Sequence, residues 1–134
     1  MDTTLKYIKM CEEAKEIQDL APKIRTRIHT KMNICICSDD KFGLGGVYYC
    51  MDTVSDDGIT VESTYAVWLP RQDQLQEILN KTTYFILMDF TNFVDSKWGY
   101  ESCVVNKYSM EQLWLAFVMK EKFNKHWDNN IWTK

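Results

Sequence analysis

The spacing of apolar residues near the start of the chain has the period of a helix. Between residues 3 and 20, apolar side chains recur every three or four positions, which places them on one helical face: Tyr7, Met10, Ala14 and Ile17. Asp2 or Thr3 is suited to cap the first turn. Pro22 is expected to end the helix, because the residue before a proline avoids the helical conformation.

From residue 23 to residue 37 the period changes to two. The even positions are mainly apolar, and the odd positions carry a basic row: Lys23, Arg25, Arg27, His29 and Lys31. Strict alternation predicts one strand with a buried face and a hydrated face. Toward Cys35 and Cys37 both faces become apolar, so we expect this end to be covered on both sides.

The middle of the chain predicts further short elements. Residues 46–51 and 59–68 have the composition of strands, and Asp56-Asp57-Gly58 between them is typical of a hairpin turn. Residues 72–80 then predict a short helix. Residues 101–106 are a candidate short strand.

Residues 83–95 are open to two interpretations. Five successive apolar residues, 84–88, fit a buried strand. The whole segment, however, fits helical spacing better through Thr83, Ile86, Leu87, Phe90, Phe93 and Val94. We therefore predict a helix here.

The clearest element is a helix over residues 109–127. Ser109 and Gln112 have the spacing of a capping box, in which the serine hydroxyl accepts from the amide three residues later. Residues 113–119 are all apolar and cover every side of a helix, so neighbouring elements must enclose them. Phe123 and Trp127 share one face of the second half, which we expect to lie at the edge of the domain.

Together these elements predict one α+β domain over residues 1–134. Its architecture is a short antiparallel sheet of about three to four strands, covered by three to four helices, with the C-terminal helix buried. The balance of 46% hydrophobic and 26% charged residues is typical of a globular chain. No apolar run approaches the roughly 18 residues of a membrane span.

Charge and cysteine content narrow the setting. A net charge of -3 argues against binding nucleic acid by bulk charge. The five cysteines are an odd number, and the chain starts with a helical pattern instead of a secretory leader. We therefore expect a cytoplasmic protein with reduced thiols.

Two segments resemble small uncharacterised proteins encoded by bacteriophages and prophages. They are residues 68–77 (WLPRQDQLQE) and residues 109–123 (SMEQLWLAFVMKEKF), the latter followed by Trp127. The resemblance extends over most of the chain and is weakest in residues 38–65. It implies a phage setting, in the cytoplasm of a bacterial host cell, and it implies no reaction, cofactor or catalytic residue.

Candidate chemistry is sparse. Cys35 and Cys37, with His29 and Cys50, are better explained as thiols of a buried strand than as zinc ligands, because zinc sites usually use a C-x2-C turn. The glycines in 43–46 follow Lys41 and lack the order of a phosphate-binding loop. The acidic residues near the turns are better explained as turn formers and solubilising charges than as catalytic carboxylates. We therefore assign no metal, cofactor or catalytic residue.

Three functions remain open. The preferred one is a phage-encoded accessory protein that binds a host or phage protein, for instance to inhibit a host defence system, with Phe123, Trp127 and Trp132 as interface candidates. A nucleic-acid-binding accessory protein would use the basic row, whose alternative explanation is a guarded edge strand. A small metal-dependent enzyme is the third. The enclosed run 113–119 also raises the possibility of a homodimer.

Overall fold

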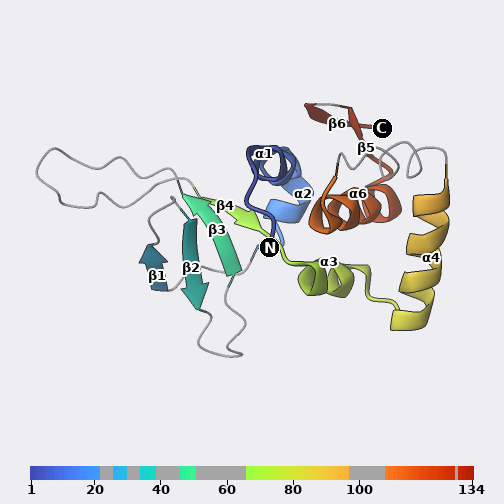
Figure 1. Ribbon diagram of the computed structural model, residues 1–134, viewed down its shortest axis with the longest axis horizontal. Coiled ribbons are helices and arrows are strands. Elements are labelled where there is room, and N and C mark those ends of the chain that lie inside the picture. The colour runs from blue at the N-terminus through green and yellow to red at the C-terminus, as the bar shows by residue number, and fades with distance from the viewer. Residues whose placement is uncertain (22–25, 30–33, 39–45, 51–65, 97–107, 129) are drawn as a thin grey trace, which may run out of the picture.

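Figure 1 shows a four-stranded sheet on one side of a group of helices, with α4 on the opposite side. This computed structural model describes residues 1–21, 26–29, 34–38, 46–50, 66–96, 108–128 and 130–134. The α+β architecture expected from the sequence is confirmed. Helix α6 is enclosed by its neighbours, and the sheet contacts the helices mainly through α1.

The four-stranded sheet is antiparallel throughout. Its order follows the sequence: β1 (Thr26–His29), β2 (Ile34–Ser38), β3 (Gly46–Cys50) and β4 (Ala66–Leu69). The register aligns Ile28, Ile36, Val47 and Leu69 across the four strands. The strand predicted over 46–51 is confirmed. Of the strand predicted over 59–68, residues 66–69 form β4. The rest of it, the turn at 56–58 and the candidate strand at 101–106 lie outside the described residues.

The single strand predicted over residues 23–37 is wrong. Its residues form two strands, β1 and β2, and the chain reverses direction between them. The alternation is not interrupted, because an even residue, Ile28, pairs with another even residue, Ile36. A reversal that preserves the parity of the pattern cannot be detected from the period alone.

The helix predicted over residues 3–20 is divided. α1 (Leu5–Glu13) ends at Ala14, whose backbone has φ -84° and ψ 68°, and α2 (Lys15–Gln18) follows. The cap of α1 is Thr4, whose hydroxyl accepts from the Tyr7 amide at 3.3 Å. The expectation that Asp2 or Thr3 caps this helix is therefore wrong.

The break in the first helix lets Gln18 close one edge of the sheet. Its Oε1 accepts from the Trp68 amide at 2.8 Å, and its Nε2 donates to the Trp68 carbonyl at 3.0 Å. The same Nε2 donates to the Cys11 carbonyl at 3.0 Å. One side-chain amide thus supplies hydrogen-bond partners to the Trp68 amide and carbonyl at the outer edge of β4, as a neighbouring strand would.

Two helices follow β4, as predicted. α3 (Gln72–Leu79) ends at Asn80, which has the left-handed φ of 50° that often terminates a helix. Gln74 supports its start, since its Oε1 accepts from the Arg71 amide at 2.9 Å. α4 (Thr83–Asp95) confirms the helical interpretation of residues 83–95.

Helix α6 (Met110–Phe123) confirms the predicted cap and enclosure. The Ser109 hydroxyl accepts from the Gln112 amide at 3.2 Å, and every residue in 113–119 is buried. The predicted end at residue 127 is wrong. Asn124 takes a left-handed φ of 52°, and the Lys125 amide bonds back to the Met119 carbonyl at 3.1 Å. This is a Schellman ending with asparagine in the position usually held by glycine.

A short hairpin follows, made of β5 (His126–Asp128) and β6 (Ile131–Thr133). Trp127 and Trp132 face each other across it with ring centroids 5.0 Å apart. They are only 5% and 9% exposed, and the Trp132 indole donates to the Met10 carbonyl at 3.0 Å. The expectation that these tryptophans are exposed is wrong, because the hairpin folds back onto α1.

Candidate functional site

The most distinctive surface feature is the outer side of the first half of α4. Four large apolar residues are exposed there: Tyr84 (71%), Phe85 (52%), Leu87 (50%) and Met88 (44%). We call these four residues the α4 face. At these exposures they present about 400 Å² if each side chain has about 200 Å² to lose. Patches of this size on soluble proteins are often functional.

The inner side of α4 is held firmly against α6. Ile86 is buried, and the Phe90 ring stacks on Trp114 with centroids 4.0 Å apart and planes at 3°. Phe93 and Phe117 add a tilted pair at 5.4 Å. Lys81, in the loop before the helix, pairs with Asp89 at 2.7 Å and with Glu121 of α6 at 3.4 Å. The α4 face is therefore carried on a packed helix.

Sequence reasoning did not identify the α4 face. It assigned Leu87 to the same side as Ile86 and Phe90, yet Leu87 is half exposed. The available signal was the unbroken apolar run 84–88, which is too wide for one buried stripe. In α6 a similar run is enclosed on all sides, whereas α4 lies at one end of the described part of the molecule (Figure 1).

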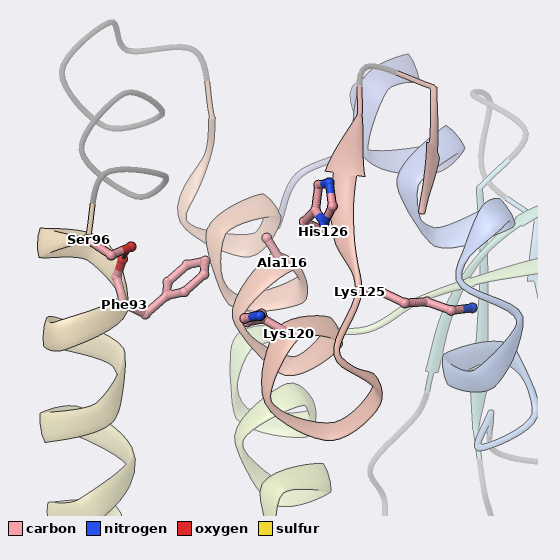
Figure 2. A pocket seen from close by; sticks show the side chains of 6 residues that line it. All are labelled: Phe93, Ser96, Ala116, Lys120, Lys125 and His126. Atoms are coloured by element: carbon pink, nitrogen blue, oxygen red, sulfur yellow. Dashed lines mark hydrogen bonds between the residues drawn. The ribbon is translucent and has the colours of Figure 1, made fainter. Parts of the chain in front are cut away.

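A cavity of about 300 Å³ lies between α4, α6 and β5. Figure 2 shows Phe93 and Ser96 on one side of it and Ala116, Lys120 and His126 on the other. Lys125 also lines the cavity, but its side chain extends away from α4 in this view. Its ammonium group forms an ion pair with Glu16. The hydrogen bond from Lys125 is the main reason that the pKa of Glu16 is lowered.

The basic row is divided between described and undescribed parts of the chain. Arg27 and His29 lie on β1, at one edge of the four-stranded sheet. Lys23, Arg25 and Lys31 lie outside the described residues. Arg27 and His29 thus share an edge strand, and this position agrees with the alternative of a guarded edge strand.

The candidate metal ligands are distributed over neighbouring strands. The register pairs His29 with Cys35, and Cys35 with Tyr48, whereas Cys50 pairs with Ala66. Over the described ranges, no group of three or more His, Cys, Asp or Glu side chains is arranged to hold a metal ion. The glycines at 43–45 fall outside those ranges.

The interface candidates at the C-terminal end are covered by the chain itself. Phe123 is partly buried against the core, and Trp127 and Trp132 belong to that core. Cys11 is also fully buried, and burial raises the pKa of its thiol. It has the environment of an inert core cysteine.

Comparison of the chain with protein-family models, with curated proteins and with solved structures gives no match. None of the helices within the described ranges is long and apolar enough to cross a membrane. Within the described ranges, the α4 face and the cavity between α4, α6 and β5 are the two candidate binding features.

Proposed function

We propose that this protein acts by binding another protein through the α4 face. The observation that carries the proposal is the exposure of Tyr84, Phe85, Leu87 and Met88 on two consecutive turns of one helix. Single exposed apolar residues are ordinary, whereas a contiguous group on a packed element is typical of a contact surface.

The shape of the surface favours a concave partner. Tyr84, Leu87 and Met88 follow the i, i+3, i+4 spacing with which a helix enters an apolar groove. The next turn of the same side is polar and exposed at Thr91 and Asn92. We therefore expect the contact to be centred on the first half of α4, with a polar rim beyond it.

The proposed partner is a host or phage protein in the bacterial cytoplasm, and inhibition of a host defence system is one concrete version. The phage setting is supported by the resemblance of residues 68–77 and 109–123 to phage and prophage proteins. Burying about 400 Å² of apolar surface contributes about 10 kcal/mol before the cost of association. A partner that buries a similar apolar area brings the total to about 20 kcal/mol, and after an association cost of about 4–15 kcal/mol this range includes the roughly 8 kcal/mol of micromolar binding. Such binding requires no catalytic chemistry.

The test is a pair of double variants with equal added charge. Leu87→Asp with Met88→Asp places two carboxylates in the α4 face. Thr91→Asp with Asn92→Asp places two on the polar turn beside it. We expect the wild-type protein and the polar-turn variant to retain one partner in stoichiometric amounts from host cells. The α4-face variant should lose at least about 90% of it, because buried unpaired charges are costly.

The affinity of the purified partner for each variant, measured by calorimetry, then decides the proposal. Equal affinity for all three proteins would overturn it. The remaining alternative is a homodimer formed through the α4 face, which sedimentation of the wild-type protein alone detects. A dimer that the α4-face variant dissociates would assign this surface to a second copy of the chain.

A further inference from the structure

The cavity between α4 and α6 has a small side chain, that of Ala116, in its lining. Ala116 is the only small residue in the apolar run 113–119, and its methyl group lies at the wall of the cavity (Figure 2). Phe93 faces it from α4. Phe93 and Ala116 thus give the cavity an apolar part, and Ser96, Lys120 and His126 add polar groups to its lining.

Among the described residues that line the cavity, the charged side chains are basic. Lys120 is exposed and lies one turn after Ala116; its ammonium group donates one hydrogen bond, to Asn124 Oδ1 at 2.9 Å. An ammonium group has three N–H donors, so Lys120 can bind a further acceptor. None of the described lining residues is acidic.

His126 provides a second polar group on the same side. Its Nε2 contacts the Thr133 hydroxyl at 2.9 Å, which holds the ring in place on β5. Neutral histidine has one donor and one acceptor nitrogen, so it can accompany a lysine at an anionic group. The Lys125 ammonium group forms an ion pair with Glu16, so we do not include it among the groups that would bind an anion.

We propose that this cavity binds a small carboxylate of about ten non-hydrogen atoms in all, most of them in an apolar body. The apolar body would contact Phe93 and Ala116, and the carboxylate would accept from Lys120 and His126. A volume of about 300 Å³ corresponds to about ten water molecules at about 30 Å³ each. This places the cavity at the small end of ligand sites.

Three matched probes separate the apolar and ionic contributions: phenylacetate, neutral phenylacetamide and cationic phenethylamine. Each is titrated into the full-length protein and followed by NMR shifts of the Ala116 methyl group and of the amides near Phe93 and His126. We expect phenylacetate to bind with a Kd of about 1 mM, as for a ten-atom fragment. Phenylacetamide should bind at least about threefold more weakly, and phenethylamine more weakly still, because they lack the anion.

Two lysine variants locate the ionic contact. Lys120→Gln should weaken phenylacetate binding about fivefold and leave phenylacetamide unchanged, because an exposed lysine contributes modestly. Lys122→Gln removes the same charge from the same helix but from outside this cavity, and should change neither probe. Equal effects of the two variants would overturn the carboxylate assignment.

A third variant tests the cavity itself. Ala116→Leu should fill the space and abolish binding of all three probes, and its thermal unfolding shows whether the fold is retained. Undiminished binding of phenylacetate to a folded Ala116→Leu protein contradicts the proposal. So do equal affinities of the three probes for the wild type, or no shifts at 93 and 126 when the probe is raised about tenfold above the expected Kd.

Discussion

At the scale of single residues, Asp2 joins two helices that are far apart in the sequence. Its Oδ1 accepts from the Thr4 amide at 2.8 Å, beside the start of α1. Its Oδ2 accepts from the Ser109 hydroxyl and from Gln112 Nε2 at the start of α6, the latter at 2.6 Å. In a complete capping box the Gln112 side chain would contact the Ser109 backbone amide, whereas here its Nε2 donates to Asp2.

Asp2 also couples stability to pH. Burial by itself raises the pKa of this carboxyl, but hydrogen bonds from Ser109, Thr4 and Gln112 outweigh it and leave the pKa below its ordinary value. The folded protein therefore holds this proton less tightly than the unfolded chain. The stabilisation is fully present above the ordinary pKa of about 4 and is lost as the pH falls through the lower folded value.

We predict that Asp2→Asn lowers the free energy of unfolding by about 1–2 kcal/mol at pH 7, because charge-assisted hydrogen bonds are lost. The difference from wild type should be smaller at pH 2–3 than at pH 7, because lowering the pH through the folded pKa of Asp2 protonates its carboxylate. Urea unfolding at both pH values measures it. Asp19→Asn is the exposed control and should cost little at either pH. A loss that is equal at pH 7 and pH 2–3 would show that the Asp2 charge is not responsible.

At the scale of elements, the side-chain amide of Gln18 takes the place of a fifth strand beside β4. The sheet is thereby closed on this edge, while β1 forms the other edge. The function of Gln18 depends on the break at Ala14, because an uninterrupted helix would direct position 18 elsewhere.

Gln18→Ala is expected to lower the free energy of unfolding by about 2 kcal/mol, since the Trp68 amide and carbonyl both lose their partner. Chemical denaturation measures this. Hydrogen exchange of the Trp68 amide should also become faster, which a general loss of stability would not confine to one edge. Gln72→Ala, at the exposed start of α3, is the matched control. An unchanged exchange rate at Trp68 would contradict the edge-closing role.

Local signals explain which elements could be predicted. The cap at Ser109 and the enclosure of 113–119 follow from a few adjacent residues, and both are confirmed. The helix over 83–95 also follows from its period. In contrast, the reversal between β1 and β2 preserves the parity of the pattern, and Asn124 ends α6 without the usual glycine. Neither leaves a strong signal in the sequence.

The candidate site depends on tertiary contacts, which explains why it was missed. A run of apolar residues shows that a helix is covered on some side, but the covered side depends on which elements are adjacent. Helix α6 has neighbours all around, whereas in the described part of the chain the aromatic rings of α4 that contact α6 lie on one side of the helix. The predicted exposure of Trp127 and Trp132 is wrong for the same reason, because the hairpin after Asn124 turns both side chains toward the core.

At the scale of the whole molecule, the two end segments of the chain are interlocked. The Met1 ammonium pairs with Glu111 at 3.4 Å, and Lys9 Nζ donates to Asn130 at 3.0 Å. The Trp132 indole bonds to the Met10 carbonyl across 122 residues of sequence. The β5–β6 hairpin thus completes the burial of α1.

Trp132→Phe is expected to lower the free energy of unfolding by about 1–3 kcal/mol, because the buried Met10 carbonyl loses its donor. Thermal or urea unfolding measures the change. Ile131→Ala, at a half-exposed neighbour in the same strand, should cost less. A smaller loss at Trp132 than at Ile131 would show that the hairpin is not part of the stabilising core.

The contacts of Asp2 also bear on the order of folding during synthesis, because its partners in α6 are made much later. Asp2 is made 110 residues before its partner Gln112, which at about 5–20 residues per second is a delay of about 6–22 seconds. During this interval α1 can meet β4, where the Tyr7 hydroxyl donates to the Pro70 carbonyl at 2.6 Å. The Asp2 carboxylate then still lacks its partners at the start of α6. A nascent chain that stalls before Ser109 therefore leaves the apolar side of α1 without its later cover, available to chaperones and proteases.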